Sequence, residues 1–205
     1  EFERRYAAMP PSVKAELIEG VVYVASPVRI RRHGSPHPEL VSWTGVYQVY
    51  TPGVLAGGNA TVRLDNDNEP QPDVSMLIEK GGQARVDEDD YIEGAPEFVA
   101  EVAASTVSYD LNDKLKSYRR NGVREYLVWR VLDEAIDWFA LREGKYESLP
   151  AGMDAITRSE VFPGLWLDAA ALLRGDLARV HDVLHKGLAS PEHAEFVARL
   201  QKSNP

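Results

Sequence analysis

The sequence predicts an α/β fold, because strand-like and helix-like patterns alternate through most of the chain and helices dominate its end. The clearest pattern spans residues 96–129, where an apolar, β-prone run at 99–103 precedes an amphipathic helix ending at Asn121-Gly122 and a second strand. Further strands are expected at residues 57–64, 74–78 and 159–167, and in hairpins at 15–25 around Glu19-Gly20 and 135–149 around Gly144. We expect helices at residues 38–49 and from 169 onward, with a break near Ser190-Pro191.

Length and composition indicate a globular chain. The 205 residues are 44% hydrophobic and 27% charged, which suits one domain with an added tail. The chain has no cysteine, so disulfides and thiolate metal sites are excluded. No apolar run approaches the roughly 20 residues of a membrane span, and no signal-peptide pattern is visible. These features predict a cytoplasmic protein that does not enter a membrane.

The formal net charge of −9 argues against a generally basic surface of the kind that holds nucleic acid. Much of the acid lies in residues 65–69 and 87–93, and we expect residues 81–94 to form an exposed loop. The cations form two clusters, each of which is either a solvated face or a contact for a polyanion. They are Lys114, Lys116, Arg119, Arg120, Arg124 and Arg130 near the central helix, and Arg29, Arg31, Arg32 and His33 before the first long helix.

Glu101 is the clearest oddity, because it lies in the middle of the apolar strand at residues 99–103. An unpaired carboxylate there would cost several kcal/mol or shift its pKa, so something must compensate for its charge. Asp110, Lys114 and Tyr118 follow at a spacing that places them in one row along the next helix. Lys114 can therefore face the strand end. Asp110 is expected to pair with Lys114, and Tyr118 either holds Lys114 or packs in the core.

Two more carboxylates are candidates with simpler alternatives. Asp73 follows Pro72 at the head of a strand, where a carboxylate can enter an active site or merely cap a turn. Glu16 precedes the predicted turn at Glu19-Gly20, where an exposed strand residue is the simpler interpretation.

Five motifs occur in a specific order: Ala15-Glu16-Leu17-Ile18-Glu19-Gly20, Gln71-Pro72-Asp73-Val74, Phe98-Val99-Ala100-Glu101-Val102, Asp110-x3-Lys114-x3-Tyr118-x3-Gly122-Val123-x-Glu125-Tyr126, and Phe162-Pro163-Gly164-Leu165. Together they resemble the Uma2 family of restriction-endonuclease-like proteins, in the PD-(D/E)xK nuclease superfamily. The resemblance covers about residues 16–173. It implies a restriction-endonuclease-like core with a mixed, curved sheet flanked by helices in residues 1–175, followed by a C-terminal helical extension in 176–205.

The resemblance also implies a divalent-metal site. Asp73 and Glu101 match the two acids of the family motif, and Lys114 matches a lysine of the family pattern. Glu16 matches an early glutamate and would be an additional acidic ligand. In the wider superfamily a lysine follows the second acid by two positions, and here Ala103 stands in that place.

Three functions are compatible with these residues. Two carboxylates on neighbouring strands suit Mg²⁺ or Mn²⁺, so the first is a metal-dependent endonuclease that hydrolyses phosphodiester bonds, in DNA. A homodimer groove would concentrate the basic helix and offset the acidic surface. The second is a catalytically inactive module of the same fold that binds nucleic acid or protein, which Ala103 favours. The third is a metal-free ion network formed by Asp73, Glu101 and Lys114.

Overall fold

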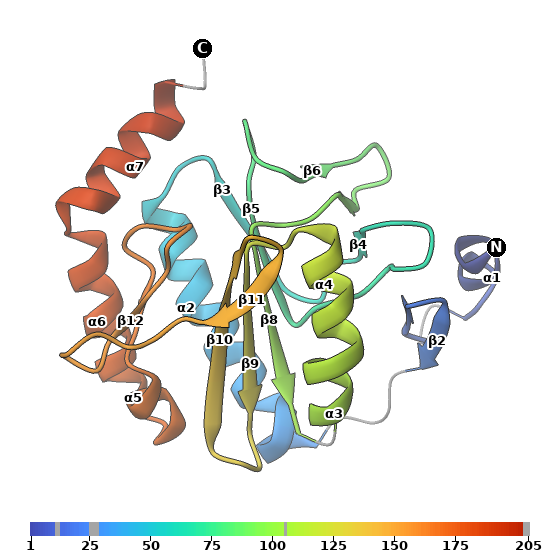
Figure 1. Ribbon diagram of the computed structural model, residues 1–205, viewed down its shortest axis with the longest axis horizontal. Coiled ribbons are helices and arrows are strands. Elements are labelled where there is room, and N and C mark those ends of the chain that lie inside the picture. Colours follow the sequence, from blue (N-terminus) through green and yellow to red (C-terminus); the bar gives the residue numbers. More distant parts are fainter. Residues whose placement is uncertain (11–12, 25–28, 105, 203–205) are drawn as a thin grey trace.

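A six-stranded mixed sheet forms the centre of the molecule (Figure 1). The computed structural model describes residues 1–10, 13–24, 29–104 and 106–202, with every side chain except those of Arg32 and His33. The strand order is β11-β10-β9-β8-β5-β3, in which β8 and β9 are parallel and every other pair is antiparallel. The strands are β3 (Val54–Gly57), β5 (Val74–Ile78), β8 (Phe98–Ala103), β9 (Glu125–Arg130), β10 (Ala135–Arg142) and β11 (Lys145–Ser148). The predicted α/β class with a mixed sheet is confirmed.

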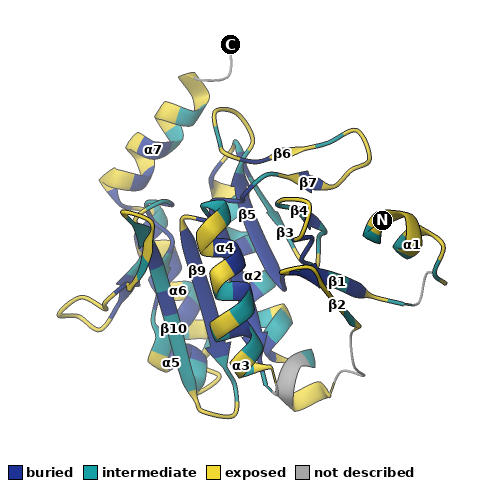
Figure 2. Cartoon of the chain, turned by 45° about the vertical axis from the view of Figure 1, so that its right-hand side comes forward, coloured by how far each residue is buried: buried dark blue, intermediate teal, exposed yellow. Residues whose placement is uncertain are grey.

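Helices cover both faces of this sheet (Figures 1 and 2). One face carries the continuous helix formed by α3 (Val107–Tyr109), the π-helical turn η2 (Asp110–Lys114) and α4 (Leu115–Asn121). The other face is covered by α2 (Pro36–Tyr50), α5 (Ala169–Leu173), α6 (Leu177–Leu188) and α7 (Pro191–Lys202). All six residues of β8 are buried between these layers.

The side chains of β8 alternate between the two layers as the sequence indicates. Val99 and Ala103 pack with Tyr118 and Tyr126 beneath the α3–α4 helix. Phe98, Ala100 and Val102 belong to the larger core on the opposite face, which also contains Trp43, Trp138, Val180, Leu184 and Phe196. The alternation of β8 therefore places Glu101 on the face of the sheet that is covered by the α3–α4 helix, where the core is smaller.

Two small sheets and a hairpin surround this centre. The hairpin pairs β1 (Ala15–Ile18) with β2 (Val21–Val24), and its turn residues Glu19 and Gly20 both have positive φ, at 50° and 76°. That backbone is the one a two-residue hairpin turn needs, so the turn predicted at Glu19-Gly20 is confirmed. The remaining elements are α1 (Phe2–Ala7), η1 (Ile30–Gly34), β4 (Val62–Arg63), β6 (Arg85–Val86), β7 (Ile92–Glu93), β12 (Thr157–Arg158) and β13 (Trp166–Leu167).

Two expectations for this region need correction. The strand expected at residues 57–64 is divided between β3 and β4, which lie in different sheets, because Asn59 turns the chain with a φ of 55°. The segment expected to form an exposed loop, residues 81–94, is mostly exposed as expected, but it also contains β6 and β7, and β7 pairs with β4 and buries Ile92.

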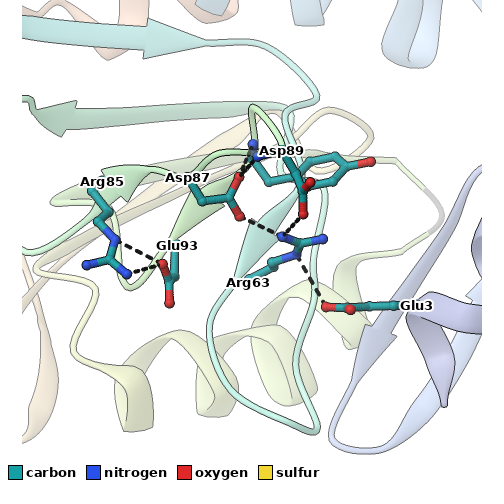
Figure 3. Close-up of polar contacts among 7 residues, drawn as sticks. Glu3, Arg63, Arg85, Asp87, Asp89 and Glu93 are labelled. Carbon is teal, nitrogen blue, oxygen red and sulfur yellow. Dashed lines mark hydrogen bonds and ion pairs between the residues drawn. The ribbon is translucent and has the colours of Figure 1, made fainter.

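The acidic run before β7 serves mainly to hold cations of the protein itself (Figure 3). Nη1 of Arg63 lies 2.6 Å from an oxygen of Asp87 and 3.1 Å from one of Asp89, and its Nε lies 3.3 Å from Glu3 of α1. Arg85 pairs in the same way with Glu93 at 2.6 Å. These contacts connect α1 and β4 to the segment that the charge pattern alone assigned to solvent.

Two buried carboxylates bind loops at the other end of β8 and β9. Glu97 accepts hydrogen bonds from the backbone N–H groups of Ile78 and Gln83, at 3.0 and 2.7 Å. Glu125 accepts from the Ser159 hydroxyl at 2.8 Å and from the N–H groups of Glu160 and Val161 at 2.7 and 3.1 Å. Glu125 thereby holds the segment between β12 and β13 against the sheet.

Stability should depend on pH through Glu125. Burial raises the pKa of Glu125 from 4.5 to about 7, although Ser159 and the loop N–H groups oppose the shift. The carboxyl therefore contributes stability that is complete below its unfolded pKa and is lost as the pH rises through the folded pKa. That contribution amounts to on the order of 3 kcal/mol. The free energy of unfolding of the wild type should therefore fall as the pH rises, in part because of Glu125. We expect Glu125→Gln to remove that part of the fall, as measured by urea unfolding of both proteins at several pH values. An equally steep decline in the variant would contradict the assignment.

Candidate active site

Lys114 lies at the centre of a buried group of acidic side chains. Its Nζ is 2.8 Å from Oε1 of Glu101 and 3.0 Å from Oε1 of Glu16. The hydroxyl of Tyr118 donates a second hydrogen bond to Oε1 of Glu101, also at 2.8 Å. Side-chain exposure rises from 6% at Glu101 to 20% at Glu16, so the group opens to solvent on the side of the β1–β2 hairpin.

Asp73 reaches this group from the strand next to β8. The pairs Val74–Ala100 and Ser75–Val99 establish an antiparallel register, and continuing it one residue beyond β5 would set Asp73 opposite Glu101. Directly opposed residues on antiparallel strands point to the same face. Oδ2 of Asp73 accepts a 2.7 Å hydrogen bond from the backbone N–H of Val102, which ties the end of β5 to β8.

Glu16 is held in place by backbone on the other side. Its Oε1 accepts a 2.7 Å hydrogen bond from the N–H of Gln71, two residues before Asp73. The Gln71 side chain donates to the Tyr6 hydroxyl at 3.0 Å and lies 3.2 Å from the Thr61 hydroxyl. The hairpin, the segment before β5 and α1 are thus connected at the rim of the site.

The π-helical turn η2 places both of its end residues, Asp110 and Lys114, inside the protein. An inserted π turn widens a helix locally and often marks a functional site. Asp110 is 3% exposed, and its Oδ2 has no hydrogen-bond partner in the described part of the chain. The hydroxyl of Tyr126 donates to the backbone carbonyl of Asp110 at 3.0 Å and supports this turn.

Burial and mutual repulsion set the charges of the group. Burial raises the pKa of Glu101 well above its usual range, and Lys114 opposes that shift. Burial alone would lower the pKa of Lys114, but Glu101, Glu16 and Asp110 together hold it well above its usual value. Burial raises the pKa of Asp110 to about 6, against the attraction of Lys114. Lys114 therefore remains a cation among more carboxylates than it can neutralise.

The structure brings together the four residues singled out by the sequence: Glu16, Asp73, Glu101 and Lys114. It differs in the details of their partners. Tyr118 packs in the core, which was one of the two expected roles, and its hydroxyl hydrogen-bonds to Glu101 rather than to Lys114. The described ion pairs of Lys114 do not include Asp110. The contact between Gln71 and Glu16 could not be predicted from the sequence. It is made by a backbone N–H, which every residue except proline has, so it depends on the path of the chain and not on the type of residue. The sequence also suggests Ser105-Thr106 as the start of the helix that carries Lys114, and Ser105 lies outside the described residues.

Most of the cations near the central helix are exposed to solvent, as expected, and most of them also contact other groups of the protein. Arg120 pairs with Glu19 and Asp65 at 3.0 and 3.2 Å, and Arg130 pairs with Asp133 and Asp137 at 2.7 and 2.6 Å. Arg119 donates to the carbonyl of Gly144, and Arg124 donates to Gln83. The ion pairs of Arg120 and Arg130 neutralise part of the positive charge in this region, whereas the partners of Arg119 and Arg124 are uncharged.

The residues of the site suit a divalent cation of the magnesium type. No three acidic or histidine side chains among the described residues are close enough together to form a complete protein cage for an ion. Mg²⁺ is commonly held by only one or two carboxylates, with waters and substrate phosphate completing its shell. Asp73 and Glu101 would be such a pair, and the oxygen of Asp110 without a hydrogen-bond partner in the described chain, together with the carboxyl groups that surround Lys114, would favour additional positive charge.

No helix in the described ranges is long and apolar enough to cross a lipid bilayer.

Comparison with known proteins places this geometry in a family. The fold resembles the crystal structure of a protein from Anabaena variabilis ATCC 29413 named as a "putative nuclease belonging to DUF820". That similarity has a TM-score of 0.62 at 17% sequence identity and covers 83% of this chain and 97% of the other. The comparison confirms the restriction-endonuclease-like fold. No curated protein sequence matches the chain. Residues 1–170 match the profile of Uma2, described as "Putative restriction endonuclease", and the chain therefore belongs to the Uma2 family.

Proposed function

We propose that this chain is a metal-dependent endonuclease that hydrolyses phosphodiester bonds in DNA. The observation that carries the proposal is the convergence of Glu16, Asp73, Glu101 and Lys114 from β1, the head of β5, β8 and η2. Membership of a family described as nucleases supports the reaction class. A cytoplasmic location and a homodimer that pairs two such sites belong to the same proposal.

Asp73 and Glu101 would hold Mg²⁺ or Mn²⁺, with Glu16 as an additional acidic group at the solvent side. Such an ion supplies positive charge to the scissile phosphate and lowers the pKa of water bound to it. The hydrogen bond from the backbone N–H of Val102 holds the carboxylate of Asp73 at β8, which supports a carboxylate pair that is positioned before substrate arrives. Preorganised charge of this kind is the largest contribution that a protein makes to reactions in which charge develops.

Lys114 would serve two purposes in this site. Its hydrogen bond and ion pair hold Glu101 and Glu16 in position. An ammonium has three donors, so one remains to orient the attacking water or to stabilise the phosphate. Lys114 comes from the helix rather than from the strand position occupied by Ala103, yet it lies 2.8 Å from Glu101. That distance weakens the argument from Ala103 for an inactive protein.

A catalytically inactive binding module remains the second candidate, because Oε1 of Glu101 already accepts from both Lys114 and Tyr118. Incubation of the protein with plasmid DNA distinguishes the two. We expect nicking or linearisation in Mg²⁺ or Mn²⁺ and none in EDTA. DNA binding without any cleavage in either metal would favour the inactive module.

A further inference from the structure

The groups that would act on DNA lie deep in the protein. The side chains of Lys114 and Glu101 are only 5% and 6% exposed, and the group opens to solvent beside the β1–β2 hairpin, where Glu16 is 20% exposed. A DNA duplex is a stiff rod with a persistence length of about 50 nm, whereas a single strand bends locally. A buried site behind a hairpin therefore suits an unpaired strand better than an intact duplex.

Two tyrosine rings lie at this entrance. Glu16 and Tyr23 are directly opposed in the hairpin, so their side chains point to the same face. The ring of Tyr23 packs on that of Tyr109 in α3, with 4.2 Å between the centroids and 38° between the planes. Nζ of Lys114 lies 5.4 Å from the centroid of the Tyr109 ring. A single ring therefore separates Tyr23 from the ammonium that holds Glu16 and Glu101.

This tyrosine pair has surface and hydrogen-bonding capacity left for a ligand. Both residues are only partly buried, so part of each remains open to solvent. The hydroxyl of Tyr109 is buried, and among the described residues it has no hydrogen-bond partner. A buried hydroxyl without a partner is costly, and a phosphate oxygen is an acceptor that would satisfy it. The pair thus offers an aromatic face and a free donor beside Lys114.

The strand that carries Tyr23 has no charged side chain. Its valines, Val21, Val22 and Val24, are 51%, 48% and 61% exposed, and the chain as a whole carries a net charge of −9. Attraction between the protein and phosphate is therefore weak, whereas a base that stacks on an aromatic ring needs no opposite charge. Every base has a π-face, but in a duplex those faces are already stacked on neighbouring bases. Stacking at this entrance therefore selects unpaired bases.

We propose that Tyr23, supported by Tyr109, is a stacking platform for an unpaired base, and that the substrate of this site is single-stranded DNA. This inference rests on the proposed nuclease function and names its substrate class. The base rests on the exposed part of the Tyr23 ring, and the Tyr109 hydroxyl donates to a phosphate oxygen of the same strand. Negative supercoiling favours local strand opening, so a supercoiled plasmid also offers unpaired segments.

Fluorescence anisotropy of a labelled oligonucleotide in EDTA tests the platform without interference from cleavage. Tyr23→Leu keeps apolar packing on Tyr109 but removes the ring, whereas Tyr23→Phe keeps the ring. We expect the wild type to bind the single strand more tightly than the duplex of the same sequence. Tyr23→Leu should weaken single-strand binding roughly 5- to 100-fold, with an unchanged log–log salt slope because no phosphate contact is lost. Tyr23→Phe should bind as the wild type does.

Tyr50→Leu is the matched control for the loss of an exposed ring. Tyr50 is 53% exposed, and it packs on His185 of α6 in the layer on the opposite face of the sheet. Its variant should bind the single strand as tightly as the wild type. An equal loss in Tyr50→Leu, normal binding by Tyr23→Leu, or equal affinity of the wild type for strand and duplex would each overturn the platform. Should Tyr23→Leu fail to fold, the preference of the wild type for the single strand still decides.

Cleavage in Mn²⁺ is scored separately, so the two proposals can fail independently. Asp73-dependent cleavage that is equally fast on strand and duplex, and unchanged in Tyr23→Leu, would leave the nuclease standing and remove the platform. Single-strand binding that depends on Tyr23 without any cleavage would keep the platform and remove the nuclease. If both proposals hold, Tyr23→Leu should raise KM for the single strand and leave kcat unchanged, since it loses binding that ground state and transition state share.

Discussion

Asp73→Asn and Glu101→Gln should each reduce DNA cleavage by on the order of 10³-fold or more, because each removes a charge that the reaction needs in a preorganised site. Both substitutions preserve side-chain shape. In Asp73→Asn, the new amide oxygen can still accept the hydrogen bond that Val102 donates to Asp73. Glu101→Gln keeps an oxygen for Lys114 and Tyr118. We therefore expect folded proteins with wild-type circular dichroism and almost no activity.

Glu147→Gln is the matched control for these carboxylates, because Glu147 is an exposed residue of β11 paired with Arg142 at the sheet edge. Its cleavage rate should equal that of the wild type. Retained cleavage in both Asp73→Asn and Glu101→Gln would show that the reaction occurs elsewhere in the molecule. Circular dichroism of the same samples distinguishes a folded but inactive variant from one that has lost its fold. Only the folded, inactive variant supports the assignment.

Lys114→Met should lower the free energy of unfolding by about 3–5 kcal/mol, because removing one partner leaves a buried charge uncompensated. The ammonium of Lys114 is the described ion-pair partner of Glu101, which is itself 4% exposed. Methionine fills a similar volume, so the loss reports charge rather than a cavity. Chemical denaturation of wild type and variant measures this difference.

Two further variants separate charge from other effects of this substitution. Lys116 on the same helix is 62% exposed, and its ion pair with Asp113 is long, at 3.8 Å. Lys116→Met should therefore change the free energy of unfolding by less than about 0.5 kcal/mol. Adding Glu101→Gln to Lys114→Met removes the orphaned carboxylate and should restore part of the lost stability. A Lys114→Met protein as stable as Lys116→Met would contradict the role assigned to the buried pair.

Local periodicity was enough to predict the part of the site that lies on neighbouring residues of one element. The alternation of β8 assigned Glu101 to the face shared with Val99, and helical spacing aligned Asp110, Lys114 and Tyr118. The requirement that a buried carboxylate be compensated then pointed to Lys114. These inferences succeed because they depend on backbone geometry that a short sequence determines.

Long-range contacts explain what could not be predicted. Arg120 appears free in the sequence, but its partner Glu19 lies 101 positions away. Arg63 likewise finds Asp87 and Asp89 across a segment that resembles a solvated loop. The strand expected at residues 57–64 failed because a single left-handed residue, Asn59, redirects the chain. The division into residues 1–175 and an extension at 176–205 stays a prediction, although α6 and α7 add Val180, Leu184 and Phe196 to the main core.

The central claim is that Asp73 and Glu101 form a divalent-metal site, and thermal unfolding tests it most directly. A ligand that binds only the folded state must raise the free energy of unfolding, by RT ln(1 + L/Kd) at a free ligand concentration L. The chelator-treated wild type and Asp73→Asn are compared with and without millimolar Mn²⁺. We expect Mn²⁺ to raise the melting temperature of the wild type and to leave that of Asp73→Asn unchanged. No shift in the wild type, or an equal shift in both proteins, would contradict a metal site at these carboxylates.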